Sequence, residues 1–200
     1  MARVFITGST DGLGRAAARA LIDGGHGVVL HARSRGRASA VDDLAPRSAG
    51  VVIGDLSRAA ETRRVADQVN AIGRMDAVIH NAGAYSTTGR SPTPEGHPAI
   101  TAVNILAPYM LTALIERPRR LVYLSSGMHR GGTASLHDVD WVGRRWNSSQ
   151  AYSDSKLHVT ALAFAVARRW PDVLSNAVDP GWVATKMGGP GAPDDFEEGY

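Results

Sequence analysis

Residues 3–14 of the chain read RVFITGSTDGLG, a short run of β-branched and aromatic residues followed by a turn with three glycines. The run Arg3–Thr7 predicts a strand, and Leu13, Ala17 and Leu21 then recur at helical spacing. Glycines between a strand and a helix let the backbone turn tightly and approach a pyrophosphate, whose charge meets the amides at the helix start. The stretch therefore predicts a dinucleotide-binding turn; the alternative is a glycine-rich turn that binds nothing.

The rest of the chain alternates strand-like and helix-like segments. The further strands are expected at Val28–His31, Val51–Gly54, Met75–His80, Arg120–Ser125 and Val173–Val178. Further helices are expected at Ser57–Ile72 (with Ser57 as N-cap), Ala99–Glu116 and Gln150–Arg169. Because the strands are mostly continuous apolar runs, the pattern predicts one α/β domain over residues 1–200, with a parallel sheet covered by helices on both faces.

Composition excludes several classes of protein. The 200 residues contain no cysteine, so disulfides and thiolate metal sites are excluded, as suits a reducing compartment. No apolar run approaches the roughly 20 residues that cross a bilayer, and the N-terminus lacks a signal-peptide layout, so no membrane span and a cytoplasmic location are expected. The net charge is +3, and the arginine pairs are scattered without interleaved aromatics, which argues against nucleic-acid binding.

Tyr152 and Lys156 lie four residues apart in a predicted helix, so their side chains share one face. An ammonium beside a phenol favours the phenolate, which would bring the tyrosine pKa down from about 10 toward working pH. Only two of the 22 lysine and arginine residues are lysines, so this one does not come from a general surplus. The pair predicts an acid/base group; the alternative is a tyrosine that packs on a lysine stem.

Together these motifs resemble those of the short-chain dehydrogenase/reductase family, in its retinol-dehydrogenase-like branch. The matching stretches, in the family's order, are Thr7–Gly14, Asp55–Leu56, Asn81–Gly83, Asn104, Ser125–Ser126, Tyr152 with Lys156, and Asp179–Thr185. The resemblance implies a Rossmann-like doubly wound parallel sheet. It also implies six strands here, with the usual seventh apparently absent, because residues 188–200 are rich in glycine, proline and acidic residues. The sixth strand is then expected to be an exposed edge.

The resemblance also implies catalytic roles. Tyr152 would be the acid/base residue, Lys156 would lower its pKa and bind the nicotinamide ribose, and Ser126 would polarise the substrate carbonyl, with Ser125 a lesser candidate. Asn104 would hold a water in a proton relay. Pro108 has no N–H for the carbonyl of Asn104, which leaves that oxygen free to accept from a water; the alternative is that Pro108 only kinks the helix.

For the cofactor, the implied binding residues are Gly8, Thr10, Gly12, Leu13, Gly14, Arg33, Ser34, Asp55, Leu56, Asn81, Ala82, Gly83, Tyr152, Lys156, Pro180, Gly181, Val183 and Thr185. The second strand ends in residues 31–35, HARSR, which contain no carboxylate for a ribose 2′-hydroxyl. A guanidinium suits a 2′-phosphate, so NADP(H) is favoured over NAD(H). Arg33 is expected to bind the phosphate, and Ser34 or Arg35 to contribute to its binding. The alternative is that these arginines face solvent.

The expected function is an NADP(H)-dependent oxidoreductase that interconverts a carbonyl and a primary or secondary alcohol. The alternatives are a non-catalytic NADP(H)-binding redox sensor or scaffold and, more weakly, epimerisation or dehydration on the same fold. The residues between Ser126 and Tyr152 form an unusually long excursion, Gly127–Ser149, which is expected to flank the substrate opening. Its His129, Asp138 and Asp140 are interpreted as loop residues, with no metal site. Leu157–Val166 is apolar nearly all round and is expected to be buried, in keeping with a homodimer or homotetramer.

Overall fold

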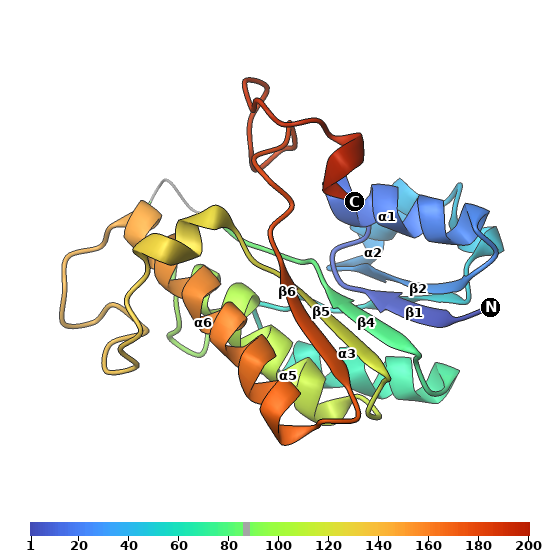
Figure 1. The fold of residues 1–200 in the computed structure, drawn as a ribbon, viewed down its shortest axis with the longest axis horizontal. Coiled ribbons are helices and arrows are strands. Elements are labelled where there is room, and N and C mark those ends of the chain that lie inside the picture. Colours follow the sequence, from blue (N-terminus) through green and yellow to red (C-terminus); the bar gives the residue numbers. More distant parts are fainter. Residues whose placement is uncertain (86–88) are drawn as a thin grey trace.

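The computed structural model describes residues 1–85 and 89–200. In this part of the chain six parallel strands form one sheet, in the order β3-β2-β1-β4-β5-β6 (Figure 1). The strands are β1 Arg3–Ile6, β2 Gly27–Ala32, β3 Gly50–Ile53, β4 Ala77–His80, β5 Arg120–Leu124 and β6 Leu174–Val178. The strand order reverses between β1 and β4, so a crevice opens at the carboxyl ends of these two strands. The predicted doubly wound parallel sheet is confirmed.

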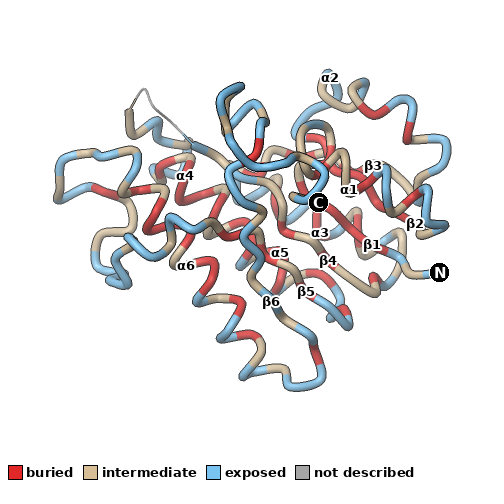
Figure 2. The backbone as a smooth tube through the Cα atoms, turned by 45° about the horizontal axis from the view of Figure 1, so that its top comes forward, coloured by how far each residue is buried: buried red, intermediate tan, exposed pale blue. Residues whose placement is uncertain are grey.

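Helices cover both faces of the sheet. They are α1 Gly12–Asp23, α2 Arg35–Ala38, α3 Ala59–Ile72, α4 Ala99–Thr101, α5 Ala107–Leu114 and α6 Ser148–Arg169. Val4 and Ile6 of β1 pack with α1, whereas Phe5 between them packs with the cluster that α3, α5 and α6 complete. Successive strand residues point to opposite faces, so this run of apolar residues fills two cores at once. Figure 2 shows the burial concentrated along the central strands and the sheet-facing sides of the helices.

The start of α3 differs from the prediction. Ser57 is not its N-cap, because the helix begins at Ala59 and the residue in the cap position is Arg58. Ser57 belongs instead to a turn in which its N–H donates to Asp55 Oδ1 at 2.9 Å. The N–H of Ala59 donates to Glu95 Oε1 at 3.0 Å, so a side chain from the loop after β4 supplies the cap.

The helix predicted at Ala99–Glu116 is interrupted. Between α4 and α5 the residues Ala102–Leu106 form a π turn, in which the N–H of Ala107 donates to the carbonyl of Ala102 five residues earlier. Pro108 follows at the start of α5 and lacks the N–H that would bond the carbonyl of Asn104. The wider turn is the local response to that missing donor, and turns of this kind are frequent at functional sites.

The segments outside the sheet follow their own paths. The segment between β4 and α4 includes residues 86–88, which lie outside the described residues. The excursion after β5 begins with a 3-10 helix, Gly127–Gly131, and continues without regular structure to α6. The tail after β6 makes a parallel bridge between Val183 and Asp194 and ends in a 3-10 turn at Glu197–Gly199.

The last strand and the last long helix are only partly covered. β6 lies at the edge of the sheet, as expected, and its Leu174 is 58% exposed. The burial expected for Leu157–Val166 is only partial within the single chain, since Phe164 in α6 is 57% exposed, and its burial in an oligomer stays a prediction. Only the sheet-facing side of the helix, with Val159 and Ala163, is enclosed.

Candidate active site

The glycine turn after β1 has the geometry that requires glycine. Gly8 and Gly12 have φ of +67° and +51°, in the left-handed region that residues with a Cβ avoid. A Cβ on Gly14 would lie 2.6 Å from the carbonyl oxygen of Gly8. Asp11 caps α1 by accepting from the Gly12 N–H at 2.9 Å. The turn thus brings bare backbone and the start of α1 to the crevice, where a phosphate is stabilised.

The residues after β4 hold this turn in place. The side-chain amide of Asn81 donates to the carbonyls of Thr7 and Gly8, at 2.8 and 3.2 Å. The N–H of Ala82 donates to the Thr7 hydroxyl at 2.9 Å. Two loops that are more than 70 positions apart in sequence therefore form one rigid wall, as the shared edge of parallel strands allows.

His31 at the end of β2, which the sequence reasoning missed, joins the two loops that follow β1 and β3. The N–H of Gly8 donates to Nδ1 at 2.9 Å, so the ring proton is on Nε2, which donates to the carbonyl of Gly54 at 2.9 Å. Burial lowers the pKa of His31, while the Gly54 carbonyl and the Asp55 charge act in the opposite direction. A neutral imidazole is thus fixed in one tautomer between the turns that follow β1 and β3.

A cleft of about 940 Å³ runs along this edge of the sheet. Among the predicted site residues, those that line it are Gly8, Thr10, Gly12, Leu13, Gly14, Arg33, Asp55, Leu56, Asn81, Ala82, Gly83, Tyr152, Lys156, Pro180 and Thr185. The predicted residues that do not line it are Ser34, Asn104, Ser126, Gly181 and Val183, whereas Ser125, the lesser candidate, does. Ser34 is exposed at the start of α2, and Val183 is buried beside the tail.

The two ends of the cleft differ in charge and chemistry. Arg33 and Arg37 line the end next to β2, where Arg33 has no ion-pair or hydrogen-bond partner among the described residues. Arg37 also lies 3.4 Å from Asp11. Arg35, expected to help Arg33, does not line the cleft, whereas Arg37 does. Arg33 precedes α2 and Arg37 lies within it, so no simple spacing in the sequence pairs them.

Tyr152 and Lys156 line the other end of the cleft from the second and third turns of α6. The Lys156 Nζ lies 5.4 Å from the centroid of the Tyr152 ring and donates to the carbonyl of Leu124 at 2.7 Å. Burial lowers the pKa of Lys156 to about 8, against the effect of Asp179. The two side chains are thus on one face, as predicted.

The predicted effect of Lys156 on the phenol is wrong. Burial raises the pKa of Tyr152 to about 12; Ser126 acts to lower it, and the charges of Asp179 and Tyr85 add to the rise. Desolvation penalises a phenolate more than this lysine, bonded elsewhere, favours it. At neutral pH Tyr152 therefore carries its proton.

The two serines after β5 have different roles. Ser125 is buried, its N–H donates to the carbonyl of Val178, and its hydroxyl lies 2.6 Å from that of Thr160. Ser126 is less buried and interacts with Tyr152, and its Oγ accepts from the Met128 N–H at 3.3 Å. Ser125 is thus engaged by the fold, whereas the Ser126 hydroxyl is beside the phenol.

Asn104 connects the π turn to the loop after β4. Its amide nitrogen donates to the Ala84 carbonyl and the Ser155 hydroxyl, both at 3.0 Å, and its oxygen accepts from the Ala84 N–H at 2.7 Å. The side chain is thus fully used in holding the wall next to Lys156. The proton relay through Asn104 stays a prediction, and it would use the backbone carbonyl, which Pro108 cannot bond.

Two side chains that sequence reasoning missed lie against Tyr152. Met187 Sδ is 3.9 Å from the phenol oxygen, and the ring of Tyr85 meets the Tyr152 ring edge-on at 5.2 Å. Both line the cleft. They give the space beside the phenol an apolar and aromatic character.

The three excursion residues weighed as metal ligands are engaged separately. His129 Nδ1 lies 2.6 Å from the carbonyl of Ser126, Asp140 pairs with His97 at 2.9 Å, and Asp138 accepts from the N–H of Val142 at 2.7 Å. Within residues 1–85 and 89–200, no group of three or more histidine and acidic side chains could hold a metal ion. Over the same residues, no helix is long and apolar enough to cross a membrane.

Comparison with known proteins gives a consistent result. The family model described as short chain dehydrogenase matches residues 2–195. Short-chain dehydrogenase chyC of Penicillium rubens is 48% identical, over all of this chain and 78% of its own length. Retinol dehydrogenase 13 of Homo sapiens is 28% identical, over 92% of this chain and 60% of its own.

Among solved structures, a short-chain dehydrogenase from Sphingobium yanoikuyae in complex with NADPH superimposes with a TM-score of 0.73. It is 23% identical, and the match covers 94% of this chain and 74% of that one, which supports the fold. The glycine cradle, the open start of α1 and the cleft from Arg33 to Lys156 fit a nicotinamide dinucleotide. The chain therefore belongs to the short-chain dehydrogenases and is an oxidoreductase of the kind that uses a nicotinamide cofactor.

Proposed function

We propose that this chain is an NADP(H)-dependent oxidoreductase that interconverts a carbonyl and an alcohol, with Tyr152 as acid/base residue. The observation that carries the proposal is one continuous cleft, with Arg33 at one end and Tyr152 and Lys156 at the other. The name of retinol dehydrogenase 13 refers to an alcohol substrate, and the Sphingobium relative was solved with NADPH. Both are in keeping with this assignment.

In carbonyl reduction, Tyr152, Ser126 and Lys156 each have a separate role. NADPH, when bound, supplies a hydride to the carbonyl carbon. Tyr152 gives its proton to the carbonyl oxygen, and a pKa of about 12 keeps that proton available at neutral pH. Ser126 donates to the same oxygen and stabilises the charge that develops there. Lys156, held by Leu124, supplies a fixed positive charge within reach of the phenol.

The preference for NADP(H) is assigned to the arginines at the other end of the cleft. Arg33 is exposed and unpaired among the described residues, so a 2′-phosphate meets a guanidinium with all of its donors free. Arg37 lies close to Asp11 and supplies a second positive charge. No carboxylate follows β2 in residues 31–37, where NAD-specific sites place one for the ribose hydroxyl.

A second candidate is a non-catalytic NADP(H)-binding redox sensor or scaffold. The contact of Met187 with the Tyr152 hydroxyl favours it, because the thioether occupies the position next to the proton donor. The apolar surface that Met187 and Tyr85 add suits an apolar ketone or aldehyde equally well.

One experiment separates the two functions. The purified chain is mixed with NADPH or NADH and a panel of apolar ketones and aldehydes, and cofactor oxidation is followed by absorbance. Turnover with a lower KM for NADPH than for NADH supports the proposal. Tight binding of NADPH without turnover on any carbonyl favours the sensor, and a preference for NADH refutes the role given to Arg33.

A further inference from the structure

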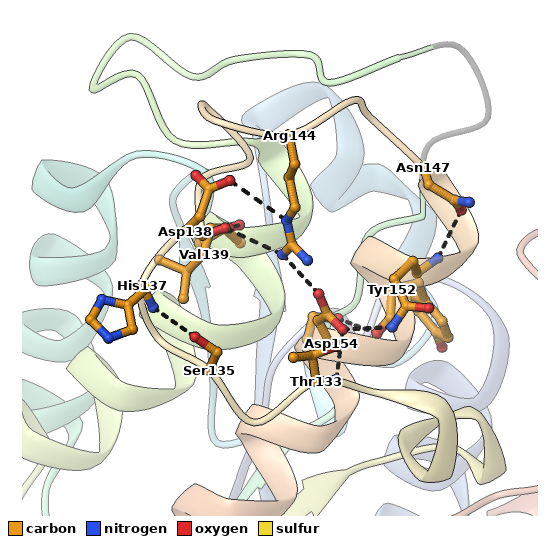
Figure 3. A network of polar contacts seen from close by, with 12 residues as sticks. Thr133, Ser135, His137, Asp138, Val139, Arg144, Asn147, Tyr152 and Asp154 are labelled. Atoms are coloured by element: carbon orange, nitrogen blue, oxygen red, sulfur yellow. Dashed lines mark hydrogen bonds and ion pairs between the residues drawn. The ribbon is translucent and has the colours of Figure 1, made fainter.

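A buried carboxylate, that of Asp154, is one of the points at which the excursion Gly127–Ser149 is attached to α6. Asp154 is 4% exposed and accepts hydrogen bonds from the Thr133 N–H at 2.8 Å, the Gln150 amide at 2.8 Å and Arg144 Nη2 at 2.9 Å (Figure 3). A buried carboxylate is stable only when its oxygens are paired in this way. The beginning and the end of the excursion therefore meet at a single side chain of the helix.

Arg144 extends the attachment into the excursion. Its guanidinium lies 3.6 Å above the Trp141 ring centroid, and its Nη2 also donates to the carbonyl of Asp138 at 3.2 Å. Trp141 is buried and has φ of +55°, a conformation that costs energy for a bulky residue and persists only when its surroundings hold it. Arg144 thus connects Asp154 to the strained, buried centre of the excursion.

The segment between Ser126 and Thr133, the first excursion residue bound to Asp154, is short and closely packed on α6. The 3-10 helix Gly127–Gly131 starts directly after Ser126, and the Gly131 carbonyl accepts from the Gln150 amide at 2.8 Å. A Cβ on Gly132 would lie 2.6 Å from the carbonyl oxygen of Ser153, so the backbone touches the helix there. The position of Ser126 relative to α6 is therefore coupled to the contact at Asp154.

Tyr152 and Asp154 are two residues apart on α6, a rotation of about 200° around the helix axis. Tyr152 faces the cleft, and Asp154 faces the excursion. We propose that Asp154 is a positioning residue: together with Arg144 it clamps the excursion to α6 and so sets the placement of Ser126 against Tyr152 and the shape of the substrate opening. This inference rests on the proposed carbonyl reduction.

The test uses D154N and R144M, with D172N as the matched control. D154N keeps an oxygen for the Thr133 N–H but removes the charge, and R144M removes the guanidinium while keeping an apolar chain over Trp141. Asp172 forms an exposed pair with Arg117 at 3.6 Å, away from α6's first turns. For each folded variant, kcat and KM for the carbonyl substrate are measured with the Kd for NADPH, and hydrogen exchange is followed by peptide.

Both clamp variants are expected to lose about tenfold to a hundredfold in kcat/KM for the carbonyl substrate, the range that small misplacements of reacting groups produce. The Kd for NADPH should stay at the wild-type value in both clamp variants. D172N should keep the wild-type kcat, KM and Kd. Faster exchange should be confined to residues 131–147. D154E, which keeps the charge, should recover part of the lost activity.

Three results would overturn the inference. They are wild-type kcat and KM in both folded clamp variants, faster exchange spread over the whole chain, and an equal loss in D172N. If the wild-type chain itself turns over no carbonyl, the proposed function fails. The exchange pattern then still decides whether the clamp exists.

Discussion

His80 at the end of β4 makes the stability of the protein depend on pH. Its side chain is 3% exposed and stacks on the Tyr123 ring at 4.7 Å, and Nε2 lies 3.2 Å from the Thr112 hydroxyl. Nδ1 has no hydrogen-bond partner within the described residues. Burial lowers the pKa of His80 from 6.5 to about 3. The folded protein therefore holds this imidazole neutral, whereas the unfolded chain protonates it at mildly acidic pH.

The sign and size of the effect follow from proton linkage. Between the two pKa values the folded state binds fewer protons than the unfolded state, so the contribution is complete above 6.5 and is lost as the pH falls toward 3. At about pH 5 the loss attributable to His80 is about 2 kcal/mol of unfolding free energy, at about 1.4 kcal/mol per pH unit. The lowered pKa of His31 acts in the same direction.

The assay is urea unfolding of the wild type and of H80Q at about pH 7.5 and pH 5, with exposed His137 replaced in H137Q as the control. The wild type and H137Q should lose about 2 kcal/mol more than H80Q between the two pH values. Equal losses in the wild type and H80Q would refute the reasoning, because His80 would then not be held neutral.

Three further variants test the site. Y152F should lower kcat by about a hundredfold or more while NADPH binding is kept, the size of a lost general acid; near-normal turnover would exclude this role. R33A should raise the KM for NADPH by about tenfold to a hundredfold and leave that for NADH unchanged, as the loss of a charge-assisted bond predicts; a similar change in R35A would count against Arg33 as the residue that binds the 2′-phosphate. G14A should lower the unfolding free energy by about 1–3 kcal/mol, because its Cβ overlaps the Gly8 carbonyl. The control G36A, where a Cβ meets open space, should unfold like the wild type in the same denaturant titration.

The sheet could be predicted from sequence because its signals are local. Runs such as Val28–Leu30 are continuously apolar, and the alternation of such runs with helical segments leaves few topologies to consider. The cap of α3 could not be predicted, because the acceptor for its Ala59 N–H, the Glu95 carboxylate, comes from a distant loop. The π turn before Pro108 could not be predicted, because the missing N–H of a proline is compatible with a kink, a helix end or a wider turn.

The sequence motifs could predict which residues meet at the cleft, but not how deeply each is buried or which side chains from the tail contact it. The shared edge of the parallel strands brings Gly8, Asn81 and Lys156 to one cleft, in agreement with the order of the motifs. The raised pKa of Tyr152 could not be foreseen, since it depends on burial, which no residue spacing reveals. Met187 was missed because its contact with the phenol depends on the path of the tail.

The imidazole at the end of β2 limits how the coenzyme preference of this enzyme can be redesigned. His31 receives a hydrogen from one loop and gives a hydrogen to another, so its replacement must offer an acceptor and a donor at opposite ends of a flat ring. Exchanges confined to Arg33 and Arg37 leave that bridge intact. A graft of the whole 31–37 segment that replaced His31 by a residue without these two groups would instead loosen the glycine loop that every dinucleotide needs.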